Sequence, residues 1–362
     1  MKVAVNLVRN SAQNSKGRIN VVLRFSALGD LILTTGFLEK LRQSRPEEEI
    51  LFVSSPEFRD LISDSFFTNC RLLFVTRSRW GALGFFFRGF KAFSQIQLLG
   101  TKSVELFDLH NVPKSRMWSA GFKLAAFLNS GEVTEKTIDK KRWDRWKLLK
   151  FKKHRGHNFS VYQQSQTLLP GPELFLPKLK NHGDRHANFS ILMALDAQHW
   201  KKIWPRDHWI QLISLLHNSN LKNIQLTLVG KSSEVPAMIP DSLLASGKIA
   251  VDNLVGKTQL KDLADIAHRH HVCICGNTAW QHISESVGTP VISFVGPLDS
   301  EFGFSPFLPT SSELSVSLEC RPCTLHGGGA CKLSGDRFHA CMKEITPQQV
   351  LSKILLIGAS HQ

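Results

Sequence analysis

The chain has 362 residues, of which 42% are hydrophobic, and it carries a formal net charge of +15. This length and composition predict two globular domains and exclude a disordered chain, and no apolar run is long enough to cross a bilayer. The positive charge indicates an anionic partner, for which nucleic acid, anionic lipid, lipopolysaccharide and nucleotide all qualify.

The first expected elements are a strand, a tight turn and a helix. Val21–Phe25 is a short β-rich apolar run, and apolar residues recur at helical spacing from Leu31 to Arg42. Between them, Gly29 gives the turn its backbone freedom and Asp30 stands at the start of the helix. Ligands of open parallel sheets bind at the carboxyl ends of strands, so Asp30 is either a functional residue or only a helix cap.

Strands and helices then alternate along both halves of the chain. In the first half we expect strands at Glu49–Val53, Cys70–Val75 and Ser103–Leu109, and a helix at Pro56–Ser63. In the second half we expect strands at Phe189–Leu195, Ile224–Val229, Ile249–Val251, Val272–Cys275 and Pro290–Val295, and helices at Arg206–Asn218, Leu260–Arg269 and Thr278–Val287. A Pro- and Gly-rich stretch at Leu168–His182 is the candidate linker, which gives domains at 1–180 and 181–362. The pattern predicts an α/β protein with two doubly wound parallel sheets.

Two stretches combine basic and aromatic residues. Arg77–Phe93 mixes arginines with phenylalanines, and Asp139–Arg155 holds nine basic and two acidic residues with Trp143 and Trp146 interleaved. The first is either an amphipathic core helix with a solvated basic face or a surface for a membrane or an anionic partner. The second is either a solvated helix face or a surface that holds a phosphorylated acceptor or the membrane.

Candidate phosphate-binding residues lie in the second half. Lys202 precedes a helix N-terminus, where an ammonium group and exposed amides can hold a phosphate together, although it is also typical of an ordinary surface lysine. The strand-to-helix turn 276–282 can cradle an anion with its amides, and His282 either reaches that anion or packs in the core. Gly256-Lys257-Thr258 is not a nucleotide triphosphate loop, because Val251 stands where its first glycine is required.

Four cysteines form the most specific spacing in the chain. They are Cys320, Cys323, Cys331 and Cys341, all within 22 positions. Four thiolates suit a tetrahedral structural metal, with zinc the best candidate. Two disulfides are the alternative, which the expected cytoplasmic location disfavours, because the N-terminal apolar segment is too short for a signal peptide.

Together these motifs resemble glycosyltransferase family nine, the heptosyltransferases of lipopolysaccharide core assembly, from about Asn20 to Leu355. The matching segments are Phe25–Thr34, Asp108–Ser115, Lys202–Pro205, Leu254–Thr258, Gly276–His282, Gly288–Pro290, Gly296–Asp299 and the cysteine-rich tail. The chain departs from the family pattern at Asn277, where the family has aspartate, at Ala279, where it has glycine, and at Leu298, where it has threonine.

The resemblance implies a GT-B fold, with two Rossmann-like domains facing each other across a cleft. It further implies an inverting, metal-independent transfer of a heptose, typically from ADP-heptose, to a lipopolysaccharide core or lipid-linked glycan acceptor. The sequence contains no Asp-x-Asp pair, which agrees with phosphates held by protein groups. In this mechanism Asp30 is the general base, and Lys202 stabilises the leaving diphosphate.

The resemblance also assigns the remaining site residues and partners. The donor phosphates would contact Asn277, Thr278, Ala279, Trp280 and His282, the nucleotide would contact Gly256, Lys257 and Thr258, and the acceptor would contact Ser26, Lys114 and Ser115. No cofactor is expected for catalysis, and the protein should associate peripherally with the anionic inner-membrane surface. The alternatives are a catalytically silent binder of sugar nucleotides or glycans in envelope assembly, and a basic zinc-containing nucleic-acid binder, which is disfavoured because the basic run lies far from the cysteines.

Overall fold

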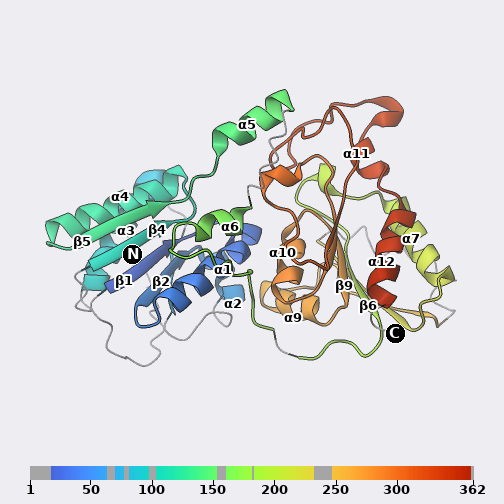
Figure 1. Ribbon diagram of the computed structural model, residues 1–362, viewed down its shortest axis with the longest axis horizontal. Coiled ribbons are helices and arrows are strands. Elements are labelled where there is room, and N and C mark those ends of the chain that lie inside the picture. Colours follow the sequence, from blue (N-terminus) through green and yellow to red (C-terminus); the bar gives the residue numbers. More distant parts are fainter. Residues whose placement is uncertain are drawn as a thin grey trace. The chain divides into compact units, whose positions relative to one another are not determined.

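The computed structural model describes residues 18–62, 70–76, 81–97, 103–152, 160–181, 183–231 and 247–359 (Figure 1). The chain divides into two compact units, with Met1–Lys140 and Val161–Pro177 in unit 1 and Lys141–Ser160 and Lys178–Gln362 in unit 2. Residues 141–160, which the predicted boundary assigns to the first domain, therefore group with the second. Within the described ranges, no helix has the length and apolar character that spanning a bilayer requires.

Unit 1 is a parallel five-stranded sheet with the strand order β3-β2-β1-β4-β5. Its strands are β1 Arg18–Leu23, β2 Glu49–Ser54, β3 Cys70–Phe74, β4 Ser103–Asp108 and β5 Glu132–Thr137. Its helices are α1 Leu28–Ser44, α2 Arg59–Ile62, α3 Gly81–Gln97, α4 Pro113–Leu128 and α6 Val161–Gln166, with the 3₁₀ turn η1 at Pro56–Phe58. The strand order reverses between β1 and β4, so a ligand of this unit is expected outside the carboxyl ends of these two strands.

Helices α3 and α4 pack against each other at unusually close range, and glycines make this possible. A Cβ atom on Gly89 would overlap the carbonyl oxygen of Trp118, and one on Gly121 would overlap that of Phe86. Phe85 and Phe93 of α3 are buried in the core of unit 1. Helix α3 is thus a core helix, although residues 77–80 of the basic aromatic stretch lie outside the described residues.

Unit 2 is a parallel six-stranded sheet with the order β11-β10-β9-β6-β7-β8. Its strands are β6 Ser190–Ala194, β7 Ile224–Val229, β8 Ile249–Asn253, β9 Val272–Gly276, β10 Val291–Phe294 and β11 Ser312–Leu314. Its helices are α5 Arg142–Phe151, α7 Arg206–Asn218, α9 Leu263–His268, α10 Ala279–Ser286, α11 Ala340–Lys343 and α12 Pro347–Ala359. Its 3₁₀ turns are η2 Trp200–Lys202, η4 Leu260–Asp262, η5 Ser300–Phe302 and η6 Gly335–Arg337. Here the order reverses between β6 and β9. The predicted α/β fold with two doubly wound parallel sheets is confirmed.

Candidate functional site

Asp30 lies at the β1/β4 switch point of unit 1, in the first turn of α1. Its carboxylate forms an ion pair with the guanidinium of Arg24, and its side chain is 20% exposed. The Ala27 amide lies 3.5 Å from Asp30 Oδ2, which is a weak capping interaction. The carboxylate is therefore more than a helix cap, because a cationic partner holds it in place and part of it remains open to solvent.

Arg24 is a site residue that the sequence analysis missed. Its side chain is only 4% exposed, and its guanidinium also donates a hydrogen bond to the Leu109 carbonyl oxygen, at the end of β4. It thereby joins the loops that follow β1 and β4. The sequence signal that could have identified Arg24 is its position as a charged residue directly after the apolar run of β1.

His110 and Lys114 both contact the hydroxyl of Ser26, so two of the predicted acceptor residues lie together. Its Nδ1 accepts a hydrogen bond from the Phe25 amide at 3.3 Å, so its Nε2 carries the proton and donates to Ser26 Oγ at 3.4 Å. Lys114 Nζ donates to the same hydroxyl at 3.3 Å. Burial, followed by the charges of Arg24 and two lysines, lowers the pKa of His110 to about 2, which keeps its imidazole neutral.

Ser115, the third predicted acceptor residue, holds the turn before α4. Its fully buried hydroxyl donates to Asp108 Oδ2 at 2.8 Å and accepts from the Val112 amide at 3.0 Å. The other oxygen of Asp108 accepts from the amides of His110 and Asn111. Ser115 thus fixes the loop that carries His110.

Lys202 and the turn after β9 meet at the β6/β9 switch point of unit 2. Lys202 Nζ donates to the Asn277 carbonyl oxygen at 3.0 Å. A Cβ atom on Gly276 would lie 2.5 Å from the Lys202 carbonyl oxygen, so only glycine allows the two backbones to approach this closely. Burial lowers the pKa of Lys202 to about 8, which leaves a poorly solvated ammonium beside the turn.

Helix α10 starts at this turn and presents an unpaired polar atom. Thr278 is its N-cap residue, and among the described residues the buried Thr278 Oγ1 has no hydrogen-bond partner. Ala279 begins the helix, and it is not among the residues with a positive φ. Alanine therefore fits where the family has glycine. An orphan hydroxyl, the first amides of a helix and a cation are groups that together bind phosphate. We call Lys202, Thr278 and the N-terminus of α10 the phosphate site.

Asparagine stands at position 277, where the family has aspartate, and its side-chain hydrogen bonds require an amide. Asn277 Nδ2 donates to the Phe304 carbonyl oxygen at 2.9 Å and to Gln281 Oε1 at 3.3 Å. An aspartate has no proton to donate to either oxygen at neutral pH. The amide thus anchors the turn, and the backbone carbonyl of Asn277 faces Lys202.

The other predicted donor residues have different surroundings. His282 is buried with its ring centroid 6.4 Å from that of Phe304, whereas Trp280 is half-buried. Gly256, Lys257 and Thr258 follow β8, which lies two strands from β6 in the sheet. There Gly256 has a φ of +72° and donates its amide to the Gly230 carbonyl oxygen at 2.8 Å, which joins the loops after β7 and β8.

The four clustered cysteines lie in unit 2 and carry free thiols, as do all seven cysteines. Burial is the main cause that raises the pKa of Cys341 to about 12, and electrostatic interaction with the other three thiols of the cluster also raises it. The four thiols are therefore close enough to interact electrostatically. Among the described residues, no group of three or more His, Cys, Asp or Glu side chains is arranged to hold a metal ion. A structural zinc at these cysteines stays a prediction.

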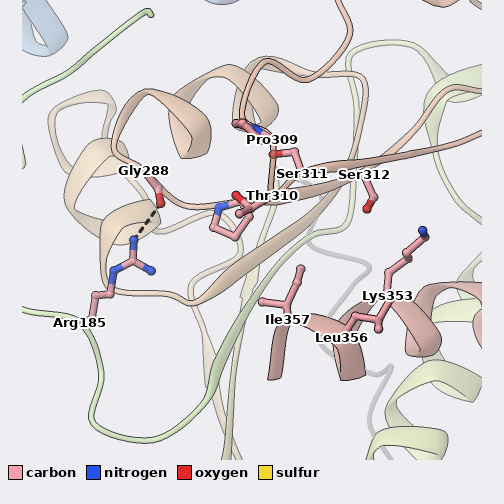
Figure 2. A pocket seen from close by; sticks show the side chains of 10 residues that line it. Arg185, Gly288, Pro309, Thr310, Ser311, Ser312, Lys353, Leu356 and Ile357 are labelled. Carbon is pink, nitrogen blue, oxygen red and sulfur yellow. Dashed lines mark hydrogen bonds between the residues drawn. The ribbon is translucent and has the colours of Figure 1, made fainter. Parts of the chain in front are cut away.

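A pocket of about 620 Å³ lies elsewhere on unit 2 (Figure 2). It is formed by the segment 309–312, by Lys353, Leu356 and Ile357 of α12, and by Arg185, which donates to the Gly288 carbonyl oxygen at 2.9 Å. Residues 288–290 precede β10 and residues 309–311 precede β11, so the pocket lies at the amino ends of these strands. None of the predicted site residues lines it, and parallel sheets bind ligands at the opposite edge.

Glu285 of α10 is a buried carboxylic acid beside this segment. Its Oε1 accepts hydrogen bonds from the amides of Phe307 and Leu308, both at 2.8 Å, and from Ser311 Oγ at 2.9 Å. Its Oε2 is buried and has no partner among the described residues. Burial raises the pKa of Glu285 from 4.5 to about 7, even though the three hydrogen bonds act against this shift.

The folded state therefore binds a proton at Glu285 more tightly than the unfolded state does. The contribution of this residue to the free energy of unfolding is present at low pH and is lost as the pH rises from about 4.5 to about 7. Glu285→Gln keeps the acceptor and cannot ionise, so we expect it to exceed the wild type in stability by about 2 kcal/mol at pH 8 and to match it near pH 4.5. Urea unfolding at both pH values checks this, and an equal difference at both would contradict it.

Part of the chain matches a known protein family. A family model described as glycosyltransferase family 9 (heptosyltransferase) matches residues 176–327. This segment, which is less than half of the chain, is therefore similar to glycosyltransferase family 9. The matched segment includes Lys202, the turn 276–282 and the loop at Gly256, and it ends within the cysteine-rich segment.

A curated relative points to the same family over a similar length. The chain is 24% identical to lipooligosaccharide heptosyltransferase 2 of Haemophilus influenzae over 155 residues, which are 42% of this chain and 42% of that relative. The aligned region thus spans less than half of the length of that relative.

Solved structures resemble nearly the whole chain. The glycosyltransferase family 9 protein of Veillonella parvula gives a TM-score of 0.67 at 15% identity, covering 95% of this chain and 97% of that one. The ADP-heptose lipopolysaccharide heptosyltransferase II of E. coli gives a TM-score of 0.65 at 15% identity, covering 95% and 99%. At such identities the likeness shows the fold, and it confirms the predicted GT-B class.

Proposed function

We propose that this protein is an inverting, metal-independent glycosyltransferase that moves a heptose from ADP-heptose to a lipopolysaccharide core acceptor. The observation that carries the proposal is the phosphate site at the β6/β9 switch point, inside the segment that matches the family 9 model. Its partly buried ammonium, the hydroxyl of Thr278 and the helix N-terminus suit the diphosphate of a sugar nucleotide. The names of the relatives from H. influenzae and E. coli support heptose as the sugar, and the latter supports ADP as the nucleotide.

The proposed reaction is a single displacement. The acceptor hydroxyl oxygen attacks the anomeric carbon, its proton passes to the Asp30 carboxylate, and the bond from the anomeric carbon to the diphosphate oxygen breaks. The diphosphate takes the bonding electrons and leaves as ADP. Lys202 and the first amides of α10 stabilise the charge that grows on it.

Unit 1 offers groups that suit an anionic acceptor. Lys114 and Ser26 lie at the same strand ends as Asp30, and the neutral imidazole of His110 holds the Ser26 hydroxyl. A cation beside a hydroxyl can bind the carboxylates or phosphates of a lipopolysaccharide core or a lipid-linked glycan. Peripheral association with the inner membrane, where such acceptors are anchored, is part of the proposal.

A nucleotide-sugar panel tests this function. The full chain is incubated with ADP-, GDP- and UDP-sugars, with and without a lipopolysaccharide-core acceptor, and free nucleoside diphosphate is measured. We expect release of ADP from ADP-heptose only when the acceptor is present, with inverted configuration at the new bond by NMR. Tight binding of sugar nucleotides in calorimetry, with no turnover on any acceptor, would instead identify a catalytically silent binding protein.

A further inference from the structure

Helix α5 is anchored to unit 2 by one of its faces. Leu148 is buried in a small cluster with Val295, Leu298 and Phe302. Leu298, which stands where the family has threonine, is therefore one of the apolar residues against which this helix packs. On the same face, the Arg145 Cζ lies 5.8 Å from the Phe304 ring centroid, and Lys152 Nζ donates to the Pro322 carbonyl oxygen.

The opposite face of α5 exposes large aromatic rings. Positions 145, 148 and 152 follow helical spacing, so positions 143, 147 and 150 lie on the other side of the helix. Trp143 is 62% exposed, Trp146 38% and Phe151 52%. Exposed aromatic rings gathered on one helix are uncommon on a surface that faces only water.

Lysines are interleaved with these rings. Lys147 Nζ lies 5.2 Å from the Trp143 ring centroid, and Lys150 Nζ lies 4.9 Å from that of Trp146 and 5.5 Å from that of Phe151. Within α5 there are four basic residues and one acidic residue. This face therefore combines apolar rings with positive charge, which complements an anionic lipid surface.

We propose that this face of α5, formed by Trp143, Trp146, Lys147, Lys150 and Phe151, docks on an anionic lipid bilayer. The two indole rings stack on each other with centroids 4.7 Å apart and an interplanar angle of 12°, so they already occupy one of each other's faces. That arrangement disfavours stacking on nucleobases and leaves the indole edges to enter the interfacial layer. The ammonium groups of Lys147 and Lys150 lie over the rings, where they are placed to bind lipid headgroups when the rings enter the interface.

Vesicle binding tests this proposal without donor or acceptor, so its outcome does not depend on the proposed sugar transfer. The full chain is co-sedimented with vesicles of phosphatidylglycerol and phosphatidylethanolamine at 1:3, and with pure phosphatidylcholine vesicles. We expect the wild type to bind the anionic vesicles. The double variants Trp143→Ser/Trp146→Ser and Lys147→Gln/Lys150→Gln should each bind on the order of 10-fold more weakly. Each lysine near the headgroups and each ring inserted into the interface contributes severalfold to the partition coefficient.

A matched control separates this face from the general positive charge. Lys180→Gln/Lys222→Gln removes the same charge from two exposed lysines of unit 2 and should bind like the wild type. Thermal unfolding checks that all variants fold, as expected because Leu148 is unchanged. Brominated lipids should quench more fluorescence in the wild type than in Trp143→Phe/Trp146→Phe, which reports insertion of the rings.

Three results would overturn the proposal. The first is equal binding of the wild type to anionic and phosphatidylcholine vesicles. The second is an equal loss of binding in the control and in the α5 variants, which would indicate diffuse attraction by the net charge of +15. The third is a loss of affinity for soluble core oligosaccharide with vesicle binding unchanged, which would make this face a glycan-binding surface.

Discussion

Asp30→Asn is expected to reduce kcat about 1,000-fold and to leave the affinity for ADP unchanged. General-base catalysis contributes about 10²–10⁴-fold, and asparagine cannot accept the proton of the acceptor hydroxyl. The donor phosphates are proposed to bind in unit 2, so the loss should fall on the chemical step. Initial rates of ADP release, together with calorimetric titration with ADP, measure the two effects separately.

The ion pair with Arg24 requires a structural control for this variant. Asparagine can still accept a hydrogen bond but removes the negative charge beside the buried guanidinium of Arg24, so Asp30→Asn is expected to lose about 1–2 kcal/mol of stability. Glu39→Gln removes a carboxylate from the same helix, where Glu39 accepts a hydrogen bond from Gln43, and it should retain wild-type activity. If a folded Asp30→Asn protein turns over at the wild-type rate, Asp30 is not the base.

The sequence was informative wherever local spacing determined the structure. Helix α7 and strand β7 have the predicted bounds, because an apolar helical stripe and a short β-rich run are local signals. Strand β5 was missed because it is an edge strand with no fully buried residue, and its sequence Glu-Val-Thr-Glu-Lys-Thr lacks an apolar run. Edge strands are stabilised by one neighbour and carry little hydrophobic pattern of their own.

The candidate site was likewise predicted only in part from local sequence signals. Motif order singled out Asp30 and Lys202, but it could not supply their partners. Arg24 matters because it reaches the Leu109 carbonyl oxygen 85 positions away, and Asn277 replaces aspartate because of the Phe304 carbonyl oxygen 27 positions away. Such contacts depend on how the loops after neighbouring strands meet, which a single sequence does not encode locally. The position of α5 in unit 2 is another long-range contact of this kind.

Lys202→Met is expected to lower kcat/KM for the donor about 100- to 1,000-fold and to raise the KM for the sugar nucleotide. Methionine has a similar length but supplies neither the charge nor the donors that the phosphate site offers to the diphosphate. Lys222→Met, which removes an exposed lysine of the same unit, should leave both constants unchanged. Initial rates over a range of donor concentrations provide the comparison, and a Lys202→Met protein with wild-type donor kinetics would contradict the phosphate site.

The lowered pKa of Lys202 makes the same assignment testable by pH. Its ammonium loses a proton through about pH 8 in the free protein, so kcat/KM for the donor should fall up to tenfold per pH unit above that value. Lys202→Arg keeps its charge throughout this range, so any activity that it retains should lack the alkaline decrease. If that decrease persists in the arginine variant, a group other than Lys202 is titrating.

Stability should change in the opposite direction to activity. Because burial holds the pKa of Lys202 below its value in the unfolded chain, the unfolded state binds this proton more tightly, and the charged lysine destabilises the free protein below about pH 8. Lys202→Met should therefore unfold at pH 7 with a free energy equal to that of the wild type or about 1–2 kcal/mol higher. A variant that loses donor affinity while it gains stability identifies a residue retained for binding an anion, whereas a residue retained for packing would lose stability as well.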